Sequence, residues 1–169
     1  MKKIVCIAAM ALLGFGNVNA QDGSLSKGSW VVEANTGSLA TGNTAFSLVS
    51  NDGNTLWAVG AEAGYFIQDK LAIKAGLGYT DLGTTGSDGI FVYKVGAKYY
   101  LNTKIPVGVD FTGSSVNDVN ANWVGLQAGY AWFVASNVSI EPTLRYNLSL
   151  DTNKAESAFQ ALVGFAFHF

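Results

Sequence analysis

The chain has 169 residues, of which 13% are charged and 12% aromatic, and it contains 20 glycines. Soluble domains carry roughly 25% charged residues, yet no segment beyond the first twenty residues reaches the ~18 apolar residues of a membrane-spanning helix. Beyond residue 20, eight basic residues face twelve acidic ones, and this net charge near −4 argues against a nucleic-acid partner.

Residues 1–20 have the features of a cleaved secretory signal. Lys2 and Lys3 give a basic start, residues 4–15 are apolar, and Ala20 ends a short run of small residues. The alternative is a membrane anchor, for which the apolar run is too short. The single cysteine, Cys6, lies in this leader, so the mature domain over residues 21–169 has no thiol chemistry.

The rest of the chain alternates large apolar residues with small or polar ones. A period of two predicts β-strands. We expect eight of them, over residues 29–39, 55–66, 71–80, 90–101, 105–112, 121–133, 138–148 and 157–169.

The predicted connections alternate in length. Three are tight, at residues 67–70, 102–104 and 134–137, and four are longer and polar, at residues 40–54, 81–89, 113–120 and 149–156. Short turns at one rim and long loops at the other are typical of outer-membrane barrels, and an even strand count puts both termini on the periplasmic side. We therefore predict an all-β fold, an eight-stranded antiparallel up-and-down transmembrane β-barrel.

One face of each predicted strand carries small aliphatic residues in the middle and aromatic residues near the ends. Amphipathic rings favour the level of the lipid headgroups, so the pattern predicts two aromatic girdles. We assign to them Trp57, Tyr65, Tyr79, Tyr93, Tyr99, Tyr130, Trp132 and Tyr146. The alternative is a lipocalin-like soluble barrel with this face inward, which would expose mostly glycine and alanine and dissolve poorly.

The opposite face carries glycines and a set of polar and charged residues. An eight-stranded barrel is just wide enough for side chains to fill its interior. The predicted lumen network comprises Glu33, Glu62, Lys74, Lys94, Lys98, Asp110, Gln127, Glu141 and Arg145. Charges removed from water need partners, because an isolated buried charge costs several kcal/mol.

The expected register supplies such partners. Closing the first tight turn with Phe66 opposite Lys70 places Glu62 directly across from Lys74. Oppositely charged cross-strand neighbours stabilise each other.

Two further acids are placed by the other tight turns. Asp110 falls opposite Gly96 and lies diagonally between the two lysines of that strand, Lys94 and Lys98. Gln127 falls opposite Arg145, with Glu141 four residues earlier on the same face.

The charged lumen has two interpretations. Four acids and four bases balance, which favours a plug of salt bridges, because a selective pore usually presents rings of one sign. The alternative is a porin-like narrow passive channel for small solutes or ions.

Pro142 lies in the middle of a predicted strand and cannot donate a ladder hydrogen bond, so we expect a bulge or local irregularity there. The single histidine, His168, falls on the inward face at the end of the last strand, where a girdle or plug role is expected rather than that of a base. With no histidine at the outer rim, no Ser-His pair can form there. No Cys/His cluster offers soft metal ligands, so we expect no metal, no cofactor and no enzymatic activity.

The last strand ends on alternating aromatics, Phe165, Phe167 and Phe169. With the leader, the strand count and the girdles, the chain from Ser29 to Phe169 resembles the small eight-stranded outer-membrane proteins. These comprise the OmpX type, the OmpA transmembrane domain and the outer membrane protein beta-barrel domain family.

The resemblance implies that the three terminal phenylalanines are recognised by the barrel assembly machinery. It also implies a monomer in a bilayer with lipopolysaccharide in the outer membrane of a Gram-negative cell envelope. The family includes barrels that modify lipid A, but their catalytic histidine and serine have no counterpart here. A surface-interaction role leaves any extracellular ligand unidentified.

Overall fold

The computed structural model describes residues 23–36, 47–51, 54–81, 83, 89–117 and 119–169. The predicted leader and its cleavage site lie outside these residues, as does most of the predicted 81–89 loop. Within the described part, no helix has the length and apolarity needed to cross a membrane.

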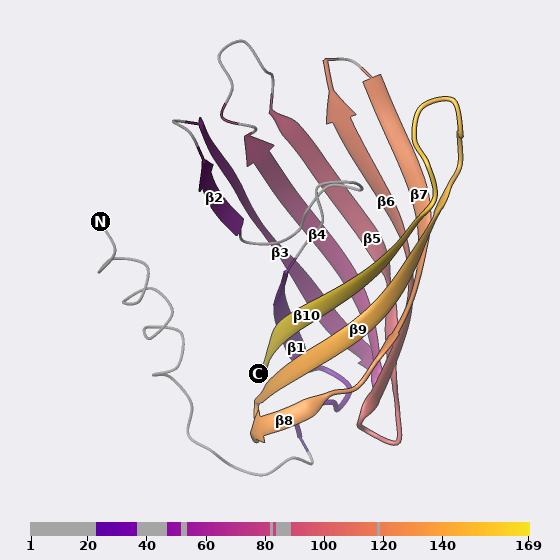
Figure 1. Cartoon of the computed structure of the whole chain (residues 1–169). Coiled ribbons are helices and arrows are strands. Elements are labelled where there is room, and N and C mark those ends of the chain that lie inside the picture. Colours follow the sequence, from indigo (N-terminus) through magenta and orange to yellow (C-terminus); the bar gives the residue numbers. More distant parts are fainter. Residues whose placement is uncertain (1–22, 37–46, 52–53, 82, 84–88, 118) are drawn as a thin grey trace.

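The described chain forms ten strands in one antiparallel sheet (Figure 1). They are β1 (Trp30–Asn35), β2 (Ser47–Asn51), β3 (Asn54–Gln68), β4 (Leu71–Asp81), β5 (Ile90–Leu101), β6 (Ile105–Val116), β7 (Val119–Gly129), β8 (Trp132–Ala135), β9 (Val138–Ser149) and β10 (Ala158–His168).

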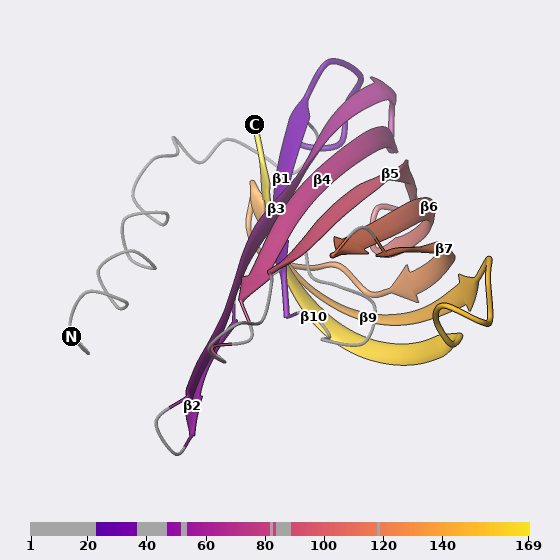
Figure 2. The same ribbon diagram turned by 90° about the horizontal axis from the view of Figure 1, so that it is seen from above.

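The sheet closes on itself through β1, which pairs with β10 on one edge and with β3 on the other. β1 and β2 pair with the same edge of β3, β2 with residues 54–58 and β1 with residues 62–65. In the same way, β7 and β8 follow one another along one edge of β9. The ten segments thus occupy eight positions around the barrel that Figure 2 shows from above. The predicted closed eight-stranded antiparallel barrel is confirmed.

Side chains alternate between a buried interior and an exposed exterior. β4 shows this without interruption, because every second residue from Ala72 to Thr80 is buried and the residues between them are exposed. The exposed set is the large apolar one, including Val59, Leu77 and Leu126. The apolar face therefore points outward, and the predicted inside-out arrangement relative to a soluble barrel is confirmed.

Two predicted loops are partly strand. The expected 40–54 loop contains β2, and the expected 113–120 loop is a hairpin in which Val116 pairs with Val119. The Gly-Ser-Asn composition suggested a loop, but the ring of Tyr93 covers Gly113, so close that a Cβ on this glycine would lie 2.2 Å from Cζ of the ring. An aromatic ring over a strand glycine protects a position that otherwise has no side chain to pack.

The irregularity expected at Pro142 is present, on the neighbouring strand. Pro142 itself stays in β9, while the facing chain breaks between β7 and β8 at Tyr130 and Ala131. The N–H of Tyr130 donates to the carbonyl of Pro142 (3.0 Å), whereas Ala131 donates to Lys104 (2.7 Å). The missing proline N–H thus coincides with the interruption of the ladder.

Candidate functional site: the charged interior

The interior of the barrel holds all eight charged residues of the predicted network. Six strands supply them, namely β1, β3, β4, β5, β6 and β9. Each side chain is buried or half-buried, and six ion pairs connect them. The pairs form two separate groups.

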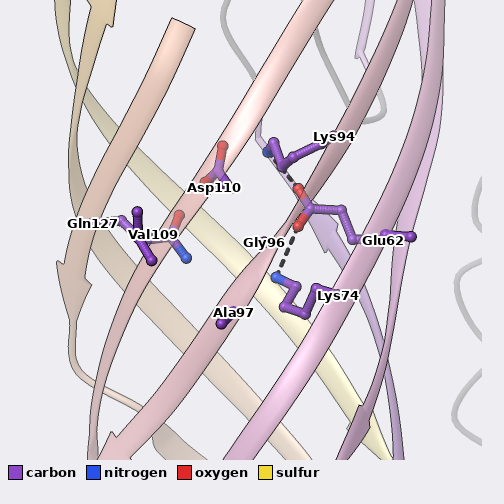
Figure 3. Close-up of a pocket in the computed structure, with 9 residues that line it drawn as sticks. Glu62, Lys74, Lys94, Gly96, Ala97, Val109, Asp110 and Gln127 are labelled. Carbon is purple, nitrogen blue, oxygen red and sulfur yellow. Dashed lines mark hydrogen bonds and ion pairs between the residues drawn. The ribbon is translucent and has the colours of Figure 1, made fainter.

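The first group is a chain of six charges that alternate in sign, in the order Lys94, Glu62, Lys74, Glu33, Lys98, Glu141. Glu62 is the first bridge, with one carboxylate oxygen 2.5 Å from Nζ of Lys94 and the other 2.8 Å from Nζ of Lys74 (Figure 3). Glu33 is the second bridge, because it accepts from Lys74 and, at 2.8 Å, from Lys98. Each interior member of the chain is therefore flanked by two opposite charges.

Glu141 ends this chain and has neutral partners as well. One of its carboxylate oxygens pairs with Lys98, and the other accepts from the Tyr100 hydroxyl at 2.9 Å and the Ser139 hydroxyl at 2.8 Å. Nζ of Lys98 also lies 4.9 Å from the centre of the Tyr100 ring. Such saturation of a buried carboxylate offsets the cost of removing it from water.

The second group is centred on one bidentate ion pair. The two terminal nitrogens of Arg145 donate to the two carboxylate oxygens of Asp110, at 2.5 and 2.6 Å. Remaining guanidinium N–H groups reach Gln127, Thr112 and Asn147, at 3.2, 3.1 and 2.7 Å. A planar fork suits this geometry in a way that a lysine ammonium does not.

A glycine makes room for the bidentate pair. Gly125 lies on β7, and a Cβ there would stand 2.1 Å from Nη2 of Arg145 and 2.9 Å from Oδ1 of Asp110. The glycines of the inward face thus create the space that the long charged side chains fill.

Little free space remains between the two groups. The residues drawn in Figure 3, among them Glu62, Lys94, Asp110 and Gln127, surround a cavity of about 10 Å³. This volume is about what a single water molecule needs. At this level the interior is filled.

The end of the barrel that carries the tight turns is closed by apolar and aromatic side chains. Phe66, Tyr100, Phe133 and His168 form a set of neighbouring rings, with centroids 5.5–6.2 Å apart. Leu25, from the segment before β1, packs with Phe66 and Tyr100 and is 6% exposed. The sequence prediction missed this apolar plug.

His168 lies in this plug and faces Ser139, with 3.4 Å between Nε2 and the hydroxyl oxygen. Both residues are almost completely buried. The Ser139 hydroxyl donates to Glu141 and has no access to solvent. In the described residues, no group of three or more His, Cys, Asp or Glu side chains is arranged to hold a metal ion.

The predicted register is confirmed for two of the three hairpins. Gly96 lies opposite Asp110, and Gln127 lies opposite Arg145. The first tight turn differs, because a register shift between Phe66 and Gln68 pairs Phe66 with Ala72.

Because of this shift, the predicted pair of Glu62 and Lys74 has a different geometry, although the ion pair itself still forms. Glu62 faces Gly76, and Lys74 faces Gly64, so the two charges are diagonal rather than directly opposite. A lysine is long enough to cover the offset, and the ion pair forms.

Two other expected partners were wrong. Asp110 on β6 pairs with Arg145 on β9, over Gly125 of the intervening strand β7, and not with Lys94 or Lys98. Glu141 pairs with Lys98, which approaches from the opposite wall, rather than neighbouring Arg145. Arg145 is separated from Asp110 by one strand, β7, and Lys98 is separated from Glu141 by two, β6 and β7, so neither pair joins adjacent strands of a hairpin.

The predicted girdle residues all lie on the outer surface. Their exposed fractions run from 36% for Tyr93 to 63% for Trp132, and the other members are Trp57, Tyr65, Tyr79, Tyr99, Tyr130 and Tyr146. Of the terminal phenylalanines, Phe165 and Phe169 are exposed and Phe167 is half-buried. These placements fit a lipid-facing belt.

No protein-family model matches the chain, and no curated protein matches its sequence. Among solved structures, the N-terminal β-barrel domain of OprF from Pseudomonas aeruginosa is similar, with a TM-score of 0.57 and 15% identity over 85% of this chain and 98% of that one. Ail of Yersinia pestis, in a phospholipid bilayer nanodisc, gives a TM-score of 0.48 and 13% identity over 85% of this chain and 100% of that one. The likeness to the OprF domain, together with the closed eight-stranded sheet, shows that the chain has the fold of a small outer-membrane β-barrel.

Proposed function

We propose that this protein is an integral outer-membrane β-barrel with a structural or surface-interaction role, and that its lumen carries no current. The observation that carries the proposal is the dense packing of the described interior. An apolar plug closes one end, six alternating charges follow, and the Arg145–Asp110 pair lies beside Glu62 and Lys94 of that chain, across a cavity of about 10 Å³. A barrel whose lumen is filled by its own side chains contacts lipid on the outside and leaves no continuous pathway for water on the inside.

The outer wall supports the membrane location. Large apolar side chains cover the outside from β3 to β10, where a water-soluble barrel would need charges. We further propose export through a cleaved leader, a monomeric state, contact with lipopolysaccharide, and assembly by the machinery that recognises Phe165, Phe167 and Phe169. The buried Ser139–His168 pair supports a role without catalysis.

Recordings from planar bilayers test the filled lumen. The folded protein is expected to give no reproducible conductance above the bare bilayer, because the described interior leaves space for only about one water beside Lys94 and Asp110. The double variant Lys98→Ala with Glu141→Ala removes an ion pair without changing net charge and serves as the opened control. A steady ohmic conductance of the unaltered protein would instead favour the narrow passive channel.

A further inference from the structure

We propose that the end of the barrel with the tight turns binds the phosphate groups of anionic phospholipids through Lys27, Lys70 and Lys104. The inference rests on the proposed membrane location and adds a lipid partner to it. Four of the eight basic residues beyond the leader lie inside the barrel, three are these lysines, and the last is Lys154 in the β9–β10 connection.

Backbone hydrogen bonds hold the first two lysines on adjacent segments. The N–H of Lys70 donates to the carbonyl of Leu25 at 2.7 Å, and its own carbonyl accepts from Tyr100 at 2.9 Å. The N–H of Lys27 donates to a carboxylate oxygen of Asp69 at 2.8 Å. The segment before β1, the β3–β4 turn and the end of β5 are thereby fixed side by side.

Lys104 lies on the β5–β6 turn, and its carbonyl accepts from Ala131 at 2.7 Å. Lys27 and Lys104 are exposed and Lys70 is half-exposed. Among the described residues, none of these three ammonium groups takes part in an ion pair, in contrast to every lysine of the interior. Their charge is therefore available to an external anion.

Aromatic side chains place these lysines at the level of lipid headgroups. The rings of Trp30 and Tyr65 pack against each other at a tilt, with centroids 5.1 Å apart, and Tyr99 and Trp132 are exposed within a few residues of the same turns. Rings of this kind lie at the boundary between acyl chains and headgroups. Lysines just beyond that boundary extend to the phosphates.

The charge differs at the two ends of the barrel. Around the loops, the described acids are Asp81, Asp151 and Glu156, and Lys154 pairs weakly with Asp151 at 3.7 Å. This end repels phosphate, whereas at the other end the described residues contribute three lysines and one acid, Asp69, and attract it. Because headgroup phosphates are present wherever the aromatic belt meets the membrane, an anionic phospholipid is the partner that this surface fits best.

Quenching of tryptophan fluorescence by brominated lipids measures the preference of this end of the barrel for an anionic over a zwitterionic phospholipid. The double variant Trp57→Phe with Trp123→Phe keeps Trp30 and Trp132, which lie beside the lysines. The protein is folded into vesicles of phosphatidylcholine and phosphatidylglycerol, with bromine on one lipid or the other. The ratio of the two quenching efficiencies then gives the relative occupancy of the adjacent lipid shell.

We expect phosphatidylglycerol to be favoured, by up to roughly fivefold for each lysine in contact. Adding Lys27→Gln, Lys70→Asn and Lys104→Gln should return the ratio to one, and Lys154→Gln should leave it unchanged. A variant that keeps only Trp57, at the loop end, should show no preference. A ratio of one with the lysines intact, in protein whose tryptophans both lipids quench, would overturn this proposal and leave the membrane location standing. Absence of quenching by either lipid would overturn both.

Discussion

Replacing Glu33 by glutamine is expected to lower the free energy of unfolding by about 3–5 kcal/mol, the usual cost of removing one partner from a buried ion pair. Glu33 bridges Lys74 and Lys98 and is 4% exposed, so its loss leaves an excess positive charge in the interior. Urea unfolding of the barrel in detergent micelles, followed by tryptophan fluorescence, measures the difference.

Two further variants make this result specific. Lys154→Gln breaks the exposed pair with Asp151 and should cost no more than about 1 kcal/mol. Adding Lys74→Met to Glu33→Gln restores neutrality, leaves the Lys94–Glu62 and Lys98–Glu141 pairs in place, and should recover part of the loss. Equal stability of Glu33→Gln and the unaltered protein would mean that the six-charge chain does not hold the interior together.

Replacing Leu126 by arginine is expected to lower the free energy of unfolding from lipid vesicles by about 2–4 kcal/mol, the cost of a charge on the lipid face near the bilayer midplane. Leu126 is 56% exposed in the middle of β7, between Val109 and Tyr146. Urea titration of vesicle-inserted protein, with band shift on unheated gels as a second readout, measures the effect.

The matched control lies on the same strand. Asn120→Arg, near the loop end of β7, should cost about 0–1 kcal/mol, because the penalty falls toward the interface. If the outer wall faced water, arginine at Leu126 would be as harmless as arginine at Asn120. Such equality would favour the soluble barrel.

The alternation of the strands was enough to predict the barrel and its outward apolar face. Parity assigns a side to a residue as soon as the strand is recognised, and two tight turns gave the correct registers for Gly96 and Gln127. The register of the first hairpin could not be predicted, because pairing Phe66 with Ala72 instead of Lys70 is an offset of two residues, which leaves every side chain on its expected face.

The ion-pair partners of the charged residues were less predictable than the face of the sheet on which each residue lies. Cross-strand neighbours can be counted from a hairpin. The Arg145–Asp110 pair instead spans an intervening strand, and the Lys98–Glu141 pair joins strands that two others separate, so both depend on how the sheet curves and on strand tilt. Leu25 was missed for a related reason. It is a lone apolar residue among Gly and Ser before the first strand, and only the three-dimensional structure shows that this segment folds over the plug.

The central claim is that the aromatic and aliphatic side of the sheet contacts hydrocarbon while the charged side faces inward. Two single-tryptophan variants test it, one keeping Trp132, which is 63% exposed, and the other keeping Trp123, which is 2% exposed. In vesicles of phosphatidylcholine brominated on its acyl chains, strong quenching of Trp132 and weak quenching of Trp123 is the predicted result. Quenching of Trp123 as strong as that of Trp132, or a Trp132 that brominated lipid leaves unaffected, would contradict it.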